Sequence, residues 1–296
     1  MTGVLNIYKE KGYTSHDVVA IIRKIVKTKK VGHTGTLDPD ATGVLPICLG
    51  RATKLAEYLA SADKTYIAEV ILGVETNTGD ISGDVIVKKP VIFDQDAIVN
   101  AVNSFSFNAR GEYMQIPPMY SAIKIGGRKL YELARKGEII DRPARPVIIH
   151  KIHVQSFAPE KNAFTIEVEC SKGTYIRSLA ADIGHMLGCG GTMGELVRTR
   201  SGVFSIDNAI KLDMLKEIAQ NGQLEKSILS VDALLPYPKV YVTGHELTLA
   251  ANGNPLPLSV AGAPAAQGGA FWICCDNGII GLYTNDSKKL CAKVML

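Results

Sequence analysis

The segment VGHTGTLDPDATGVLP, which runs from Val31 to Pro46, places one carboxylate, that of Asp38, among small residues. Its glycines allow tight turns and the close approach of a ligand, and Pro39 biases Asp38 toward an extended backbone. A carboxylate presented in this way can act as a nucleophile. The alternative is an ordinary surface turn. The neighbouring His33 and threonines favour a functional site, because loops on a rigid scaffold often carry chemistry.

A basic segment between residues 121 and 146 is the second candidate feature. It holds seven basic and three acidic residues, so it alone carries a net charge of +4, equal to the formal charge of the whole chain. Two interpretations are open: a solvated loop, or a mobile basic arm that closes on phosphates. The basic residues are Lys124, Arg128, Lys129, Arg135, Lys136, Arg142 and Arg145.

Regular elements must position these groups. A helix is expected to begin at Thr14 or Ser15, since apolar residues recur at helical spacing from there to Val26. Tyr66–Leu72 has the pattern of a strand with one mostly buried face. Residues 164–170 alternate as a strand, after which a short turn leads into a helix that stops at Gly188.

Further helices are expected over residues 52–60, 94–102 and 212–219. The glycine-rich stretch Gly188–Gly194 follows a helix and lacks a GK[ST] ending, so it is interpreted as a helix stop and a turn, not a phosphate-binding loop. Near the C-terminus, Asp276-Asn277-Gly278 separates two apolar runs and predicts a hairpin.

These patterns predict an α+β protein of two domains. The chain has 296 residues, which suffices for two cores. We expect an α+β body over residues 1–235 and a small β-barrel-type module over residues 236–296, joined by the proline-containing connection Leu235–Pro238.

The composition of the chain argues against a disulfide framework, a metal site and a membrane span. Six cysteines show no CxxC pair, so buried free thiols are expected and not a disulfide framework or a zinc site. His150 and His153 are three residues apart in a predicted strand, where they face opposite sides and make a poor metal pair. The N-terminus lacks the apolar region of a signal peptide, and no apolar run approaches the ~18 residues of a membrane span. We therefore expect a cytoplasmic protein that does not bind a membrane.

Three blocks of the sequence resemble one protein family. They are VGHTGTLDPDATGVLPICLGRATKL from Val31, the tetrapeptide Asp63-Lys64-Thr65-Tyr66, and CSKGTYIRSLAADIGHMLGCGG from Cys170. The segment QIPPMYSAIKIGGRKLYELAR from Gln115 resembles an RNA-binding insertion of the same family. On these motifs the chain resembles the B family of pseudouridine synthases, bacterial enzymes that act on uridine 55 of tRNA. The C-terminal region resembles the family's PUA-like domain more weakly.

The resemblance implies a role for individual residues. Asp38 matches the catalytic aspartate, and Arg177 matches the arginine that pairs with it. Tyr66 matches the catalytic-site tyrosine that stacks on the target base, and His33 the histidine that helps to hold that base flipped out. The remaining residues expected to contact the substrate are Tyr175, Leu196, Lys64, Lys124, Arg128 and Lys129.

The resemblance also implies a fold and a reaction. The fold is a mixed central β-sheet flanked by helices, with a basic RNA-binding insertion at about residues 114–146 and a small C-terminal PUA-like β-barrel domain. The reaction is the isomerisation of uridine to pseudouridine at position 55 in the T-loop of tRNA, by base flipping. It needs no redox change or hydrolysis, so no cofactor and no metal is expected. The implied partner is the T-arm of tRNA, bound by a monomer without an obligate protein partner.

Several points of chemistry stay open at this stage. Asp38 can attack C1′, attack C6 of the base, or abstract a sugar proton. In each case its carboxylate must be ionised, and an arginine within a few ångströms is expected to lower its pKa by about 1–3 units and so to offset desolvation. The Tyr66 hydroxyl is one candidate for the base that accepts the C5 proton. Two other functions remain as alternatives: a non-catalytic RNA-binding protein, and a glycosylase that releases free uracil.

Overall fold

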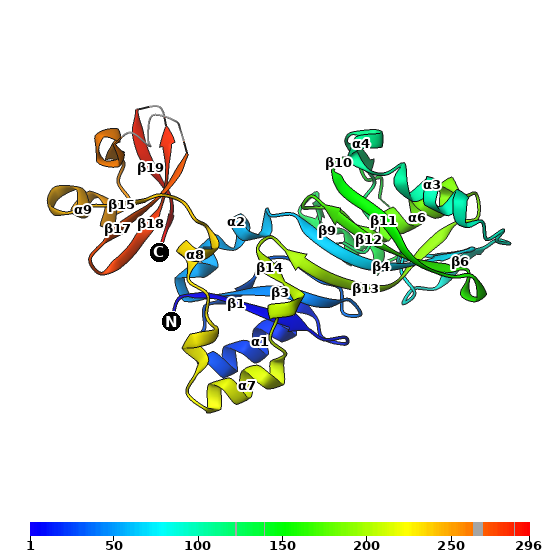
Figure 1. Ribbon diagram of the computed structural model, residues 1–296, viewed down its shortest axis with the longest axis horizontal. Helices are drawn as coiled ribbons and strands as arrows, with labels where there is room; N and C mark the ends of the chain where they lie inside the picture. The colour runs from blue at the N-terminus through cyan, green and yellow to red at the C-terminus, as the bar shows by residue number, and fades with distance from the viewer. Residues whose placement is uncertain (122, 139, 263–268, 287) are drawn as a thin grey trace.

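The computed structural model describes residues 1–121, 123–138, 140–262, 269–286 and 288–296. Its backbone forms a large mixed sheet flanked by helices and a smaller sheet built from the C-terminal residues (Figure 1). The predicted α+β class is therefore confirmed, with a central mixed sheet and a second β module.

The large sheet is organised in two halves. One half holds β1 (Gly3–Lys9) and β3 (Thr42–Leu49), and the other holds β13 (Gly191–Ser201), β4 (Lys64–Leu72), β12 (Ala163–Cys170) and β11 (Ile149–Ala158), in that order. Two short strands complete it: β2 (Val31–His33) pairs with β3, and β14 (Phe204–Ser205) pairs with β13. The predicted strands over residues 66–72 and 164–170 are confirmed.

The halves meet at one short parallel junction between β3 and β13, which we call the seam. It consists of two residue pairs, Thr42 with Val197 and Gly43 with Arg198. All other pairings in this sheet are antiparallel and longer, apart from the short β13–β14 pair. The sheet is therefore held by few ladder hydrogen bonds at its centre.

Helices cover both halves and close one core. Helix α1 (Ser15–Val26) packs with α7 (Leu212–Gln220) beside β1 and β2, whereas α3 (Gln95–Asn103) and α6 (Ile176–Met186) cover β11, β4 and β13. Thr14 caps α1 through a reciprocal capping box with Asp17, as the sequence predicts. The helices predicted near residues 94–102 and 212–219 are also confirmed.

Two sequence predictions need correction here. Residues 52–60 are not one α-helix: Gly50–Leu55 form a 3₁₀ turn in which the Thr53 hydroxyl donates to the Gly50 carbonyl, and only Ala56–Ala60 form α2. The stretch 188–194 is a turn only as far as Gly190, because β13 begins at Gly191. Glycines fit there since a Cβ at Gly191 would lie 2.8 Å from the Ala180 carbonyl oxygen.

The basic segment forms an arm on a two-stranded stalk. The stalk pairs β7 (Tyr113–Gln115) with β10 (Arg145–Val147), close to the predicted limits of the insertion. The arm between them contains the small hairpin of β8 (Lys124–Ile125) and β9 (Arg128–Lys129), followed by α5 (Leu130–Ala134). A second hairpin, β5 (Val74–Thr76) with β6 (Val85–Lys88), and the short α4 (Phe107–Arg110) complete this side.

The C-terminal sheet curls next to the start of the chain (Figure 1). Its order is β15 (Lys239–Tyr241), β17 (Ala270–Cys275), β18 (Gly278–Asp286), β19 (Lys289–Met295) and β16 (Leu256–Pro257), with α9 (Gly244–Ala251) beside it. The predicted hairpin is confirmed, with Cys275 paired to Gly278.

This sheet packs directly on the larger α+β body. Trp272 is fully buried in one hydrophobic cluster with Val4 and Leu55, and its indole N–H donates to the Leu235 carbonyl at 2.7 Å. The connection that follows the short α8 (Val231–Leu234) is thus packed against protein on both sides. A domain division at residue 235 stays a prediction.

The seam provides a direct test of the packing. Gly43 has φ +104°, and a Cβ there would lie 2.2 Å from the Arg198 carbonyl oxygen. We expect Gly43→Ala to lower the free energy of unfolding by at least ~2 kcal/mol, measured by urea denaturation. Gly222→Ala is the control, because φ is +69° there and nothing lies within 4 Å of the added Cβ. Equal losses in both variants would contradict the close approach at the seam.

Candidate active site

A cavity of about 1010 Å³ opens at the seam and gathers residues from distant parts of the sequence. Its walls include Asp38 from the loop before β3, Tyr66 from β4 and Leu196 from β13. Tyr175 and Arg177, at the start of α6, line it as well. Together with Lys64 from β4, these residues bring six of the predicted site residues around one space.

The Asp38 loop is held by buried polar contacts. The Ser15 hydroxyl accepts from the Leu37 N–H at 2.9 Å and lies 3.1 Å from the Leu37 carbonyl, to which it donates. The ammonium of Lys9, a fully buried residue, donates to the Pro39 carbonyl at 2.9 Å. A turn follows, in which the Ala41 N–H donates to the Asp38 carbonyl. These contacts fix the backbone on both sides of the carboxylate.

Arg177 is buried, and its guanidinium is surrounded by oxygen atoms. It forms an ion pair with Asp38 at 3.1 Å and a longer one with Asp80 at 3.8 Å. Its other N–H groups donate to the carbonyls of Thr78 at 3.1 Å and Tyr120 at 2.9 Å. With donors engaged on several sides, the guanidinium has a defined position from which to meet the Asp38 carboxylate.

The electrostatics of Asp38 differ from the sequence-based expectation. Burial raises the pKa of Asp38 above its ordinary value of 3.8; the charge of Arg177 acts in the opposite direction, and the nearby Asp80 raises the pKa further. Arg177 therefore lowers the pKa of Asp38, as the sequence-based argument expects, but it offsets only part of the effect of burial, and the net shift is upward. The side chain still keeps 39% of its surface exposed, so its oxygens can be reached from the cavity.

Tyr66 and Lys64 lie on the wall formed by β4. Tyr66 is 9% exposed, and burial raises the pKa of its hydroxyl, so the phenol is protonated at neutral pH. Lys64 turns its ammonium toward the end of α2, where it donates to the carbonyls of Ala60 and Ala62, both at 2.5 Å. Burial lowers the pKa of Lys64 to about 8. Its contact with a substrate stays a prediction.

His33 lies beside the cavity at the end of β2. Its Nδ1 accepts from the Gly35 N–H at 3.3 Å, and its ring meets that of His16 edge to face, with centroids 5.5 Å apart. Burial lowers the pKa of His33, and the charges of His16 and Arg198 act in the same direction. The neutral ring therefore carries its proton on Nε2.

The arm residues are placed only in part. The backbones of Lys124 and Lys129 pair in the β8–β9 hairpin, but their side chains lie outside the described part of the structure. Arg128 is exposed, and its guanidinium lies 3.8 Å from the carboxylate of Glu138. Tyr131 and Arg135, from α5 and just beyond it, reach the wall of the cavity.

Sequence reasoning missed three charged residues of the site. Asp80 lies in the loop between β5 and β6, where its sequence is typical of an exposed turn. Arg198 is fully buried and donates to the carbonyls of Val44 at 2.7 Å and Gly35 at 3.2 Å. Lys9 is at the end of β1. For Arg198 and Lys9 the available signal was a charged residue within a strand, and for Asp80 there was none, because the partners of all three are distant in the sequence.

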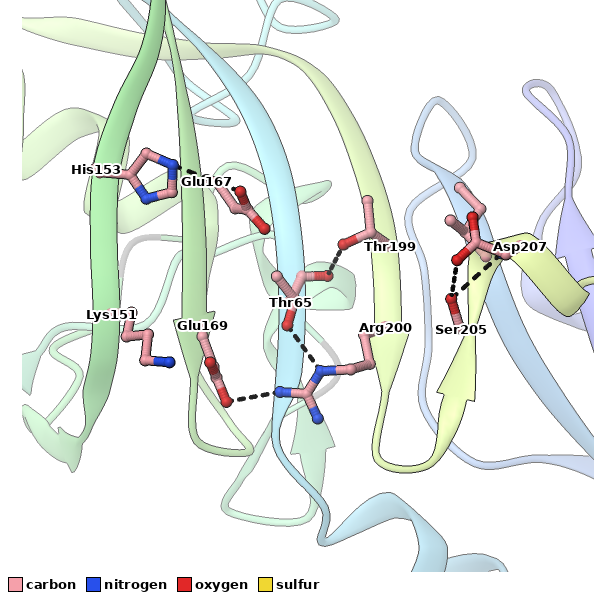
Figure 2. Close-up of a pocket in the computed structure, with 10 residues that line it drawn as sticks. Thr65, Lys151, His153, Glu167, Glu169, Thr199, Arg200, Ser205 and Asp207 are labelled. Carbon is pink, nitrogen blue, oxygen red and sulfur yellow. Dashed lines mark hydrogen bonds and ion pairs between the residues drawn. The ribbon is translucent and has the colours of Figure 1, made fainter.

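A second hollow, of about 350 Å³, lies on the opposite face of the sheet, since Thr65 precedes Tyr66 in the strand. Figure 2 shows Arg200 between Thr65 and Glu169, at 3.1 and 2.7 Å, and His153 beside Glu167 at 3.5 Å. These polar groups contact one another, and none of the predicted site residues lines the hollow. The chemistry therefore belongs to the larger cavity.

The described residues show neither a metal site nor a membrane-spanning helix. No group of three or more His, Cys, Asp or Glu residues is arranged there to hold a metal ion, and no helix there is long and apolar enough to cross a membrane. All six cysteines are free thiols. Burial raises the pKa of Cys48 and Cys170 to about 12, which keeps these two thiols unreactive.

Comparison with known families is decisive. Residues 23–176 match the family described as TruB family pseudouridylate synthase (N terminal domain), and residues 177–236 match the tRNA pseudouridylate synthase B C-terminal domain. The chain belongs to the TruB family of pseudouridylate synthases. The resemblance inferred from the sequence blocks is thereby confirmed, and the protein is a pseudouridine synthase.

Individual relatives agree with the family. Proteins named tRNA pseudouridine synthase B are 50% identical over 255 residues in Alkaliphilus oremlandii (86% of this chain and 82% of that protein) and 46% identical over 264 residues in Bacillus pumilus (87% and 84%). Among solved structures, a Cbf5-Nop10-Gar1 complex matches with a TM-score of 0.73 and 29% identity, over 99% of this chain and 84% of that one. An H/ACA RNP bound to a substrate RNA containing 2′-deoxyuridine matches with a TM-score of 0.69, at 26% identity and the same coverage.

The raised pKa of Asp38 makes a prediction about the stability of this TruB-family protein. A carboxyl whose pKa is higher in the folded state destabilises the fold once it is ionised, so this cost is present above the folded pKa and disappears as the pH falls through it. We expect Asp38→Asn to unfold at higher urea concentration than the wild type at pH 7, with the difference shrinking in acid. A variant that is less stable at pH 7, by a margin that shrinks in acid, would contradict the direction of the shift.

Proposed function

We propose that this TruB-family enzyme isomerises uridine 55 in the T-loop of tRNA. The names of its relatives, tRNA pseudouridine synthase B, support tRNA as the substrate. The observation that carries the proposed chemistry is the 3.1 Å ion pair of Asp38 and Arg177 on the wall of a cavity of about 1010 Å³, large enough to receive a flipped nucleoside.

The proposed reaction exchanges one glycosidic bond for another. The C1′–N1 bond breaks, the uracil turns within the cavity, and C5 bonds to C1′; C5 then loses a proton and N1 gains one. Asp38 supplies the negative oxygen that starts the exchange, by attack at C1′, by attack at C6 or by removal of a sugar proton. Arg177 keeps the carboxylate oriented and counterbalances its charge.

Tyr66 is proposed to receive the uracil. Removing a base from its stack costs a few kcal/mol, and stacking on an aromatic ring returns about 1–3 kcal/mol per base. Its raised pKa favours this stacking role over that of a proton acceptor, because the phenol is a weak base while it stays protonated. Tyr175 and Leu196 bound the same space, and His33 fills the position that the base leaves in the loop.

The remaining contacts with RNA are inferred from charge and composition. The basic arm contributes Lys124, Arg128 and Lys129 to phosphate binding, and the C-terminal sheet, proposed as a domain over residues 236–296, extends the RNA surface. We also propose that the enzyme acts in the cytoplasm as a monomer on the T-arm.

The role of Asp38 is tested by tritium release from tRNA labelled at C5 of uridine. We expect Asp38→Asn to lose at least ~10³-fold in rate while still binding tRNA, since the nucleophile is removed and the shape is kept. Asp96→Asn, which alters an exposed carboxylate in the first turn of α3, is the matched control.

Equal release by Asp38→Asn and the wild type would remove Asp38 from the mechanism. Free uracil among the products would indicate a glycosylase, and tRNA binding without any product would indicate a non-catalytic binding protein.

The pH dependence tests the environment of the acid. If ionised Asp38 is required, the acid limb of kcat/KM lies above pH 3.8, because burial raises the pKa of this carboxyl. Asp80→Asn removes a negative charge that raises the same pKa, so we expect the limb to move to lower pH. A limb that stays in place, or moves to higher pH, would mean that Asp80 acts mainly by holding Arg177.

Phosphate binding by the arm is tested through salt dependence. Neutralising Lys124, Arg128 and Lys129 to glutamine is expected to flatten the plot of log K for tRNA against log salt by about 0.7–0.9 per lost phosphate contact. Lys161→Gln, at an exposed turn between β11 and β12, is the control. An unchanged slope in the triple variant would show that the arm does not touch phosphates.

A further inference from the structure

The stalk of the arm is clasped to the start of α6 by one side chain. The amide of Gln115, which is 2% exposed, donates from Nε2 to the Tyr175 carbonyl at 3.0 Å and accepts at Oε1 from the Tyr175 N–H at 2.8 Å. The two residues are 60 positions apart in the sequence. A primary amide that bonds both the N–H and the carbonyl of one residue fixes the position and the orientation of that residue's backbone.

Two further hydrogen bonds join the same two segments. The Ser178 hydroxyl donates to the Ile116 carbonyl at 2.8 Å, and the Arg177 guanidinium donates to the Tyr120 carbonyl at 2.9 Å. Segment 115–120 therefore runs along the first turn of α6. The nitrogen of Arg177 that reaches Tyr120 is also the one that lies 3.1 Å from the Asp38 carboxylate.

Helix α6 has no side-chain cap of its own at its beginning, although Ile176, Arg177 and Leu179 are buried. Its N-cap residue is Tyr175, which makes no side-chain capping bond, and its first turn holds no acidic residue. The ends of helices leave backbone N–H groups without helical partners, and unfixed ends fray. The Gln115 side chain, on the stalk, bonds the backbone of this N-cap residue in place of a side-chain cap from α6 itself.

We propose that Gln115 is a positioning residue that sets where Arg177 meets Asp38, and so couples the seating of the arm on RNA to the isomerisation step. The inference rests on the proposed roles of Asp38 and Arg177. A shift of about 1 Å in a catalytic group can cost ~10²-fold in rate. The hydrogen bonds of Gln115 act two residues from Arg177, so they can change the reaction rate through the position of Arg177, without contact with the substrate.

The experiment compares two variants of the full-length enzyme. Gln115→Met keeps the length of the side chain and removes both hydrogen bonds, whereas Gln115→Glu keeps the acceptor and loses the donor. Gln155→Met is the matched control, because Gln155 is exposed on β11 and, among the described residues, its side-chain amide donates to the Glu167 side chain. The readouts are the single-turnover rate of pseudouridine formation at saturating tRNA, the Kd for tRNA, and the unfolding temperature.

We expect Gln115→Met to lower the single-turnover rate by ~10–100-fold while Kd changes less than ~3-fold, with Gln115→Glu between it and the wild type. The control keeps the wild-type rate. In an Arg177→Ala background, Gln115→Met has little further effect on the rate, because both changes disturb the same contact.

A pH profile separates positioning from a structural role. Asp38 faces Arg177 on α6, Lys9 on β1, Asp80 and Asp40 in loops, and the hydroxyls of Tyr66 and Tyr175. Of these groups, the clasp holds only Tyr175 and, through the first turn of α6, Arg177. Because Arg177 lowers the pKa of Asp38, its displacement in Gln115→Met moves the acid limb of the rate to higher pH.

Three results would overturn the coupling. A weaker Kd with an unchanged saturating rate would mean that Gln115 only anchors the arm for binding. Unfolding of both Gln115 variants would make Gln115 a residue of the fold. A normal rate in Gln115→Met, with Asp38→Asn inactive, would remove the coupling and leave the proposed function intact. Activity retained in Asp38→Asn, by contrast, would remove the proposed function itself.

Discussion

The contact between Asp38 and Arg177 joins two halves of the fold whose large sheet is paired, between β3 and β13, at only two residue pairs. Asp38 belongs to the half of the sheet that holds β1 and β3, and Arg177 belongs to the helix that packs on β13 and β4. A cavity can open at this seam because few ladder bonds close it. The ion pair then spans the gap, and the polar contacts around it serve to hold its two ends in place.

The electrostatic environment of the site keeps the Asp38 carboxylate more basic than a solvated one. Burial and the second acid, Asp80, raise the pKa of Asp38, and Arg177 and Lys9 prevent the shift from becoming larger. A carboxylate with a raised pKa is a stronger base and nucleophile than a solvated one, provided that it is ionised at the working pH. The ionised carboxylate lowers the stability of the folded protein, because a buried charge opposes folding. This conflict between a basic carboxylate and a stable fold is typical of active sites.

The sequence predicted the parts of this arrangement that local patterns encode. The capped helix from Thr14, the strand that carries Tyr66, the strand, turn and helix that lead to Arg177, and the C-terminal hairpin all follow from apolar period, capping residues and turn residues. The Asp38 loop stood out because its glycines and prolines surround a single acid. These elements are local, and their signals lie within a few residues of one another.

What the sequence did not predict depends on contacts between distant segments. Asp80 lies in an apparent surface turn, and Arg198 in a strand whose pattern does not reveal that its guanidinium binds the carbonyls of Val44 and Gly35. The sign of the pKa shift at Asp38 follows from how much protein surrounds it, a quantity that spacing does not contain. Gln115 was visible only as part of a motif, and its clasp on Tyr175 appears only in three dimensions.

The most direct test of the account is a structure of the Asp38→Asn enzyme with a T-arm RNA that carries the target uridine. The account predicts a uridine turned out of its stack, with its ring against Tyr66, the residue 38 side chain in contact with C1′, the 2′ position or C6, and Arg177 still beside residue 38. A uridine that stays stacked in its loop, with residue 38 out of reach of the sugar and the base, would contradict it.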